Sequence, residues 1–346
     1  MRALVVGRYG PPEVLESQQV PDPQPKPGEV LIRVKAIGVN FADLLQRMGV
    51  YPGTPKPPFI PGLEIAGVVE KVVEQAKVNA TETLKPGDAV LAMTTFNAYA
   101  EWVSVARDQV HTLPAGMSFD DGAAISVTYL TAYHSLFTMG NLQLGDRVLI
   151  HGAAGGVGIS AVQLARARGL VIFGTAGPAK QDYLRRAGVD HPIDYEKSDF
   201  VDVIEKYAPG GVELAMDAIG GKSFARSFKC LGPTGRLVVY GLSAAAGPDG
   251  KKSWARGLKA LVETPRFHPL KLMNRNVAVI GVSLGLALRR ARPALIKSEL
   301  DDIFTMYAAG RIKPVISKSF PLDQAAAAHQ YIQGRKNIGK VILSVR

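Results

Sequence analysis

The chain has 346 residues, of which 47% are hydrophobic and 21% are charged. This length suits two domains, and the composition is that of a globular protein with a sizeable core, which excludes bulk disorder. Because Cys230 is the single cysteine, an intrachain disulfide framework, a multi-cysteine zinc site and a cysteine-ligated iron–sulfur cluster are excluded. No secretory signal is apparent, and the longest apolar run, 277–288, is shorter than the ~20 residues that span a bilayer. We therefore expect a soluble cytoplasmic protein.

The net charge is +11, and it is concentrated in residues 247–298, which contain eleven Lys or Arg residues but only two acidic ones. Such a basic surface can attract nucleic acid, anionic lipid or an acidic substrate, or it can simply be solvated. No nucleic-acid-binding motif accompanies the charge, so we expect no nucleic-acid partner.

A short amphipathic basic helix is expected inside this segment. Ser253 can cap it, and Trp254, Leu258, Leu261 and Val262 share one face. The helix could contact a membrane surface peripherally, or it could be a lid or a dimer element.

The first 125 residues predict a β-rich domain. Alternating or β-branched runs predict strands at 1–6, 30–39, 65–73, 89–93 and 98–105. A helix is expected at 41–48, because Asn40 is a good N-cap, Asp43 lies in the first turn and Gly49 follows the end.

From about residue 147, strands and helices alternate. The expected strands are 147–151, 170–174, 212–218, 236–240 and 276–282, and the helices between them are 156–168, 178–187, 198–207 and 222–230. This alternation predicts a doubly wound parallel sheet, the Rossmann fold, in an α/β protein. Helices at 292–309 and 323–334 and a strand at 340–345 follow, and we expect them to return to the first domain. The predicted domains are 127–283 for the Rossmann part, and 1–126 with 284–346 for the discontinuous β-rich part.

The first of these Rossmann strands runs directly into a glycine-rich turn at 152–158, after which a helix begins. A strand, a tight glycine turn and a helix N-terminus are the context of a dinucleotide-binding fingerprint. Gly158 would let the helix pack closely on the strand. Ala153 stands where the motif has its first glycine, which is a departure from the strict pattern.

The second strand favours NADPH over NADH. NAD-preferring sites place Asp or Glu near its end to bind the ribose 2′-hydroxyl, but residues 159–181 contain no acid. Lys180 follows instead and would offer a cation to a 2′-phosphate, although it could also be an ordinary exposed helix lysine.

Five short motifs carry a family resemblance over essentially the whole chain: 38–43 (GVNFAD), 61–64 (PGLE), 129–133 (YLTAY), 153–158 (AAGGVG) and 337–340 (NIGK). With them the chain resembles the zinc-independent branch of the medium-chain dehydrogenases/reductases, the quinone oxidoreductases and zeta-crystallin. Within that branch, 247–275 and 191–195 are most similar to the vesicle amine transport protein-like group. The resemblance implies a GroES-like fold for the β-rich domain and assembly as a homodimer.

The resemblance also implies that no catalytic metal is bound. Zinc-dependent relatives have Cys where this chain has Asn40, and His where it has Leu63; asparagine is a poor zinc ligand and leucine is none. Without a Lewis acid, a simple ketone loses its main source of charge stabilisation. A quinone or an activated C=C bond accepts a hydride without one.

The same resemblance places Asn40, Asp43, Tyr51 and Thr131 in the pocket beside the nicotinamide. We expect Asn40 and Thr131 to orient the acceptor and Tyr51 to donate a hydrogen bond to its carbonyl, unless solvent supplies the proton. Asn40 and Asp43 could instead serve as helix caps, which does not exclude contact with the pocket, and Tyr51 could simply be a lid anchor. The residues expected to bind the cofactor lie in the glycine turn, around the second strand, after the later strands and in the 337–340 motif: Ala154, Gly155, Gly156, Val157, Gly158, Gly174, Thr175, Lys180, Tyr195, Gly241, Leu242, Val282, Leu284, Asn337 and Lys340.

Three functions follow from these observations. The leading one is an NADPH-dependent, zinc-free quinone reductase. The alternatives are an NADPH-dependent enone or enal reductase, and a non-enzymatic NADPH-binding partner of a membrane surface or lipid. In each case we expect a homodimer formed through the apolar strand 276–282, because an unpaired edge of that kind is prone to aggregation.

Overall fold

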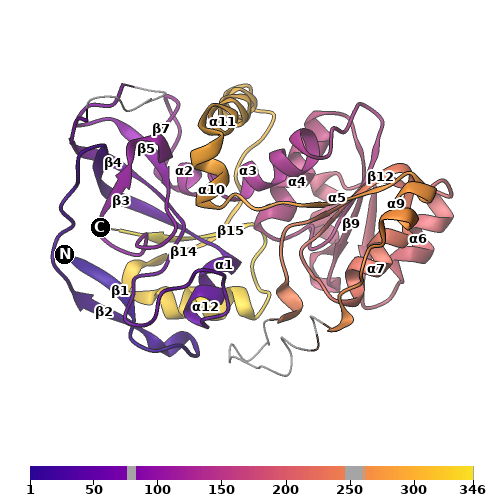
Figure 1. Cartoon of the computed structure of the whole chain (residues 1–346), viewed down its shortest axis with the longest axis horizontal. Helices are drawn as coiled ribbons and strands as arrows, with labels where there is room; N and C mark the ends of the chain where they lie inside the picture. Colours follow the sequence, from indigo (N-terminus) through magenta and orange to yellow (C-terminus); the bar gives the residue numbers. More distant parts are fainter. Residues whose placement is uncertain (76–82, 246–258, 260–261, 346) are drawn as a thin grey trace.

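The computed structural model describes residues 1–75, 83–245, 259 and 262–345. One of its sheets has six parallel strands, on the right of Figure 1. They are β8 (Arg147–Ile150), β9 (Val171–Ala176), β10 (His191–Asp194), β11 (Val212–Asp217), β12 (Leu231–Val239) and β13 (Ala278–Gly281). Their order is β10-β9-β8-β11-β12-β13, so the chain changes direction across the sheet between β8 and β11. Ligands of open α/β sheets bind at the carboxyl ends of the strands at such a switch point. The predicted Rossmann fold is confirmed.

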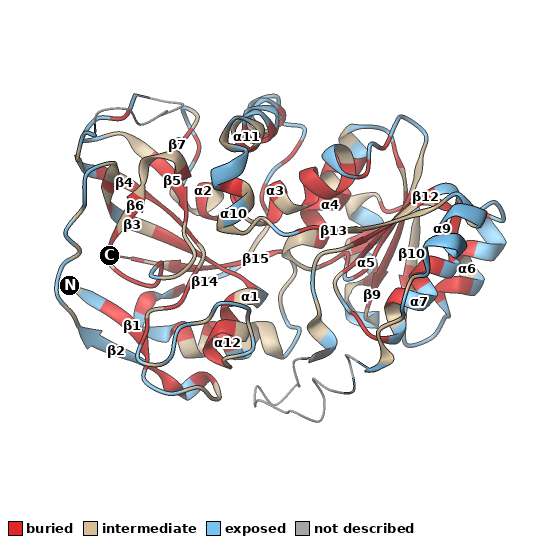
Figure 2. Ribbon diagram, viewed as in Figure 1, coloured by how far each residue is buried: buried red, intermediate tan, exposed pale blue. Residues whose placement is uncertain are grey.

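Helices cover both faces of this sheet because successive side chains of each strand point to opposite faces. Val148 and Ile150 of β8 belong to the core cluster that includes α4 (Gly156–Ala167), whereas Leu149 packs with α6 (Phe200–Tyr207) and α7 (Lys222–Lys229). A 3-10 turn (Pro178–Lys180) and α5 (Gln181–Ala187) follow β9. In Figure 2 the strands of the sheet are mainly buried, and the exposed residues lie on the outer sides of the helices.

The second sheet joins the two ends of the chain. Its strands are β14 (Ile316–Pro321), β15 (Lys340–Ser344), β3 (Glu29–Val39), β4 (Glu64–Val72), β5 (Ala89–Met93) and β7 (Val110–Thr112), in that order, with β6 (Trp102–Ala106) paired to β3. A hairpin of β1 (Arg2–Val6) and β2 (Leu15–Gln19) lies beside it, and both termini lie in this part (Figure 1). Since β15 pairs antiparallel with β3, the C-terminal segment does return to the N-terminal sheet. The domain boundaries at 126/127 and 283/284 stay a prediction.

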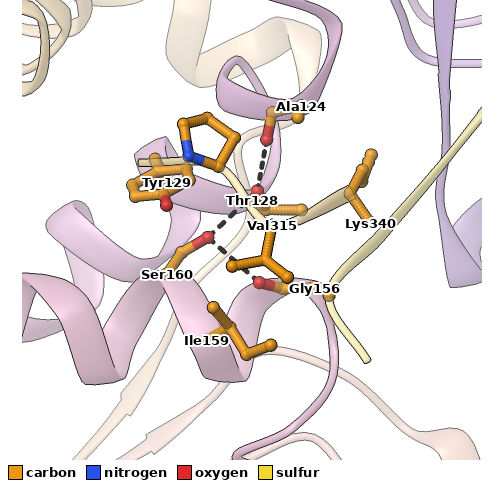
Figure 3. Close-up of a pocket in the computed structure, with 10 residues that line it drawn as sticks. Ala124, Thr128, Tyr129, Gly156, Ile159, Ser160, Val315 and Lys340 are labelled. Carbon is orange, nitrogen blue, oxygen red and sulfur yellow. Dashed lines mark hydrogen bonds between the residues drawn. The ribbon is translucent and has the colours of Figure 1, made fainter. Parts of the chain in front are cut away.

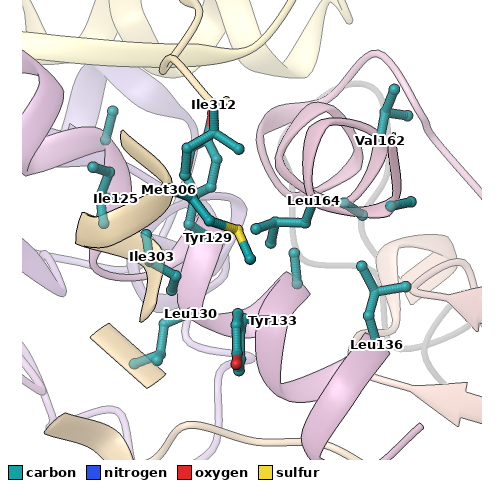
Figure 4. Close-up of a cluster of buried hydrophobic side chains, with 14 of the residues drawn as sticks. Ile125, Tyr129, Leu130, Tyr133, Leu136, Val162, Leu164, Ile303, Met306 and Ile312 are labelled. Atoms are coloured by element: carbon teal, nitrogen blue, oxygen red, sulfur yellow. The ribbon is translucent and has the colours of Figure 1, made fainter. Parts of the chain in front are cut away.

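Helices lie between and around the two sheets. They are α1 (Phe41–Arg47), α2 (Phe119–Ile125), α3 (Thr128–Tyr133), α9 (Pro269–Arg275), α10 (Leu286–Ala291), α11 (Pro293–Ala308) and α12 (Ala325–Gln333). Figure 4 shows Leu130 and Tyr133 of α3, Ile303 and Met306 of α11 and Leu164 of α4 in one apolar cluster. This cluster holds the two sheets together.

Several elements were missed by the sequence analysis, among them α2, α3 and β10. The segments of α2 and α3 contain Gly122, Thr128 and Tyr129, which have low helix propensity, but their burial in the core outweighs that preference. Pro192 argues against a strand at β10, yet β10 is an edge strand, where a missing N–H is tolerated.

The amphipathic helix expected at 253–262 lies outside the described residues except for Lys259 and Val262. Among the helices in the described part of the chain, none is long and apolar enough to cross a membrane.

Candidate functional site

The glycine turn between β8 and α4 is built so that only glycine fits at its narrowest point. A Cβ at Gly158 would lie 2.2 Å from the carbonyl oxygen of Gly152 and 2.7 Å from the Cα of Ala153. Gly152 has a φ of 61°, and the amide of Gly155 donates to the Gly152 carbonyl at 2.8 Å. The first-turn amides of α4, which begins at Gly156, have no acceptor inside the helix and favour an anion. This cradle fits a dinucleotide pyrophosphate.

Thr175 supports the turn from the second strand. Its hydroxyl accepts from the amide of Gly152 at 3.2 Å and lies 3.1 Å from Nδ1 of His151, and only 2% of Thr175 is exposed. Burial lowers the pKa of His151, against the opposing effect of Asp217. The structure thus places Thr175 behind the cradle. A direct contact between Thr175 and the cofactor stays a prediction.

Two cations meet beyond the end of β9. Lys180 is half-buried and its Nζ donates to the carbonyl of Asn337 at 2.6 Å. Nη1 of Arg335 donates to the hydroxyl of Tyr195 at 3.3 Å. Burial and then the charge of Arg335 lower the pKa of Lys180, so the two cations are close enough to repel one another. Lys180, Tyr195 and Asn337 were predicted as neighbours of the cofactor; Arg335 was missed, because its link to them is tertiary.

The carboxyl ends of the later strands complete this side of the site. Leu242 packs against Gly220, where a Cβ would lie 2.0 Å from Leu242 Cδ1, and Gly241 lies beside Ala218. The amide of Val282 donates to the carbonyl of Val239 at 2.9 Å and so extends the hydrogen bonding between β13 and β12. At this edge of the sheet, Gly241 and Leu242 therefore follow the end of β12. Val282 and Leu284 follow the end of β13.

A buried polar triad forms the centre of the site on the other sheet. Nζ of Lys340 donates to Oδ1 of Asn40 at 2.6 Å and makes a short ion pair with Oε1 of Glu64. Nδ2 of Asn40 donates to the same Glu64 oxygen at 2.7 Å. All three side chains are buried, at 8% exposure or less. Both ends of the Asn40 amide are thus bonded within the protein, and its contact with an acceptor stays a prediction.

Glu64 connects this triad to the helices between the sheets. Its other oxygen, Oε2, accepts from the hydroxyl of Ser126 at 2.6 Å and from the amide of Val127 at 2.8 Å. The carboxylate therefore has four donors, which stabilise a charge at a position that is 0% exposed. Sequence analysis placed Glu64 only inside the Pro-Gly-Leu-Glu motif and missed its role, because its partners come from three separate segments.

Asp43 lies directly behind Asn40. Its Oδ2 accepts from the amide of Asn40 at 2.8 Å and from the hydroxyl of Tyr99 at 3.1 Å, and the Tyr99 hydroxyl lies 2.9 Å from Nε2 of His329. Burial raises the pKa of Asp43 to about 7 and lowers that of His329 well below its usual value. Asp43 thus caps the N-terminus of α1, as the sequence predicted, and its contact with the acceptor pocket stays a prediction.

Tyr51 and Thr131 lie at the border of this centre. Burial and then the charge of Asp43 raise the pKa of Tyr51, while the charge of Arg289 lowers it, so both residues lie within electrostatic reach of Tyr51. Thr131 lies in α3. This helix begins directly after Val127, whose amide donates to Glu64. The amide of Thr131 in turn donates to the carbonyl of Val127 at 3.0 Å.

A small cavity lies between the glycine turn and the triad (Figure 3). It has about 10 Å³ of free volume, close to what one water molecule needs. Thr128 and Ser160 hold its walls together through a hydrogen bond of 3.1 Å, and Ser160 also donates to the carbonyl of Gly156 at 3.0 Å. Lys340 lines the cavity as well, so its side chain runs from the start of α4 to Asn40.

Within the part of the chain that the structure describes, no group of three or more His, Cys, Asp or Glu side chains could hold a metal ion. Asn40 and Leu63 occupy the two positions at which the resemblance would require metal ligands.

Comparison with known proteins agrees with this geometry. A family described as alcohol dehydrogenase GroES-like domain matches residues 26–139, and one described as zinc-binding dehydrogenase matches 187–343. The human synaptic vesicle membrane protein VAT-1 homolog is 39% identical over 99% of this chain and 86% of its own length. Human quinone oxidoreductase is 33% identical over 99% of this chain and 97% of its own. The solved structure of Escherichia coli quinone oxidoreductase complexed with NADPH has a TM-score of 0.85 and 27% identity, with all of both chains covered.

A Rossmann sheet with a glycine cradle, joined to a GroES-like domain, defines an oxidoreductase that uses a nicotinamide cofactor. The chain belongs to the medium-chain dehydrogenase/reductase superfamily, in its quinone oxidoreductase-like group with the VAT-1 homologs.

Proposed function

We propose that this protein is a zinc-free, NADPH-dependent reductase of quinones. The observation that carries the proposal is the arrangement around Asn40: a buried amide and ammonium, held by Glu64, stand where zinc-dependent relatives have a metal ligand. The cation pair of Lys180 and Arg335 beyond β9 supports NADPH as the cofactor, because it offers two donors to a 2′-phosphate.

When bound, NADPH would supply the hydride. The first turn of α4 would hold its pyrophosphate, and Lys180, Arg335 and Tyr195 its 2′-phosphate. Tyr51 would donate a hydrogen bond to the acceptor carbonyl, and because its pKa is raised its hydroxyl stays protonated at neutral pH. Asp43 and Lys340 fix the backbone and the side chain of Asn40 beside this position.

The proposal is tested by measuring NADPH oxidation with quinones, enones and aldehydes in parallel. We expect turnover of quinones and little turnover of aldehydes. Faster turnover of enones than of quinones would replace the proposal with double-bond reduction, and no turnover with any acceptor would contradict it.

Removal of metal ions should leave the activity unchanged. Because Asn40 and Leu63 supply no ligand set for zinc, prolonged incubation with EDTA should change NADPH–quinone turnover by less than about 20%, within assay error. A loss of activity that added zinc restores would contradict this expectation.

We propose further that the protein is a homodimer paired through β13, which forms one end of the six-stranded sheet. Val279 and Ile280 are half-buried there, and pairing with a second copy would protect an apolar edge. Val279→Lys or Ile280→Pro should yield monomer or aggregate in light scattering with size-exclusion chromatography. Leu144→Lys, at a site that is 83% exposed, is the control that should leave the mass unchanged. An unaltered dimer in both β13 variants would speak against this interface.

A second candidate function is peripheral membrane contact through 247–298. Leu270 and Met273 on α9 are 58% and 69% exposed, and Lys271 and Arg275 lie on the same helix. Exposed apolar and basic side chains together favour an anionic lipid surface. Co-sedimentation with phosphatidylserine vesicles, compared with phosphatidylcholine vesicles, separates this function from the catalytic one.

A further inference from the structure

Arg289 is a buried cation that links α10 to the end of β5. It lies on α10, which begins shortly after the end of β13, and only 3% of the residue is exposed. Its Nη2 donates to the carbonyl oxygen of Thr94, just after β5 in the second sheet, at 3.0 Å. The guanidinium thus joins the segment after β13 to the end of β5.

Most of the hydrogen-bonding capacity of this guanidinium is unused. Nε and Nη1 have no hydrogen-bond partner, although both atoms are buried. These two atoms carry three of the five N–H groups of an arginine. Among the described residues no carboxylate lies within ion-pair distance, whereas Arg147, for example, is paired with Glu213. Burial lowers the pKa of Arg289 to about 10, against the opposing effect of the negative charge of Asp108, so the group is charged at neutral pH.

The surroundings of Arg289 place it next to the proposed acceptor position. Thr94 donates from its amide to the carbonyl of Leu63 at 2.8 Å, and from its hydroxyl to the carbonyl of Gly62 at 2.9 Å. Leu63 directly precedes Glu64 of the buried triad, and Tyr51 lies within the electrostatic reach of Arg289. A second buried arginine, Arg47, also has unpartnered N–H groups, but it donates to Gln333 of α12, and the groups that act on its charge are Glu13 and Tyr99.

We propose that Arg289 determines substrate specificity by binding an anionic substituent of the acceptor, so that the preferred quinones carry a carboxylate. A carboxylate supplies the negative charge and the acceptor atoms that the unused N–H groups require, which a neutral carbonyl does only in part. A buried, unpaired charge is costly for the free protein, and such a group is retained where a ligand compensates it. This proposal rests on the quinone reductase function proposed above.

The test compares two naphthoquinones that differ only in a carboxylate substituent. For the wild type we expect a kcat/KM for the carboxylated quinone that exceeds the value for the neutral one. Arg289→Gln should lower the ratio of these two values by about 10- to 100-fold, mainly through KM, because charge-assisted hydrogen bonds are lost. Arg289→Lys keeps the charge but loses the planar donors. Its kcat/KM ratio should therefore lie between those of the wild type and of Arg289→Gln. Arg290→Gln, on the exposed neighbour, is the matched control and should leave the ratio unchanged.

The outcomes separate this proposal from the proposed function. A wild type without preference for the carboxylated quinone, or an Arg289→Gln variant with an unchanged ratio, would overturn the role of Arg289 alone. If the wild type reduces neither quinone, the proposed function fails. In that case, binding of the carboxylated quinone still tests the anion site. Binding to the wild type and to Arg289→Lys is measured by the quenching of tryptophan fluorescence. Equal affinity of the two proteins would overturn it.

Discussion

Lys340→Met should lower the free energy of unfolding by about 3–5 kcal/mol, because it leaves the carboxylate of Glu64 buried without its cation. The remaining donors to Glu64, from Asn40, Ser126 and Val127, are neutral and compensate the charge only in part. Urea unfolding followed by circular dichroism measures the loss. The double variant Glu64→Gln/Lys340→Met, which removes both charges, should recover most of it.

Arg185→Met is the matched control for this experiment. Arg185 makes an ion pair with Asp182, but both side chains are mostly exposed, so the variant should cost less than about 1 kcal/mol. If Lys340→Met were as mild as Arg185→Met, or if the double variant were no more stable than the single one, the ion pair would not be the source of stability described here.

Lys180→Ala should weaken NADPH binding about 10- to 100-fold and leave NADH binding nearly unchanged, since only NADPH carries the 2′-phosphate. A charge-assisted hydrogen bond contributes ~1.5–3 kcal/mol, and each 1.4 kcal/mol is a tenfold change in affinity. Arg335→Ala should also weaken NADPH binding, because Arg335 and Lys180 lie close together beyond the end of β9. Added salt should reduce the NADPH preference of the wild type, because this half-exposed site is screened.

Fluorescence titration of each variant with NADPH and with NADH gives its NADPH/NADH affinity ratio. Arg186→Ala, an exposed cation on α5, is the control and should leave the ratio unchanged. Equal weakening of both cofactors by Lys180→Ala would make Lys180 a structural residue, bound only to Asn337. A wild type that prefers NADH would contradict the argument from the missing acid.

Where sequence analysis succeeded, it relied on periodic patterns and on local motifs. The alternation of strands and helices after residue 147 was sufficient for the Rossmann sheet, and the spacing of the glycine turn located the cradle at Gly158, where no side chain fits. The helix at Phe41–Arg47 followed from its capping residues. Each of these features is determined by residues that are near one another in the chain.

Contacts between distant segments could not be predicted in this way. Lys340 was predicted as a cofactor contact, and this stays a prediction; its bonds to Asn40 and Glu64, which lie 300 and 276 positions away, were not predicted. Arg335 and Arg289 carried no local signal, and only the fold shows that one reaches Tyr195 and the other Thr94. The helices α2 and α3 were missed for the same reason, because their stability comes from burial.

The segment 335–340 bonds to four residues of the site that come from four different parts of the chain. Arg335 bonds Tyr195, the carbonyl of Asn337 accepts from Lys180, the amide of Gly339 donates to the carbonyl of Ala154 in the glycine turn at 3.0 Å, and Lys340 holds Asn40. If a bound cofactor steadies this segment, it also steadies Lys340 against Asn40, and by linkage any factor that the cofactor contributes to ordering the triad is returned as affinity for the cofactor.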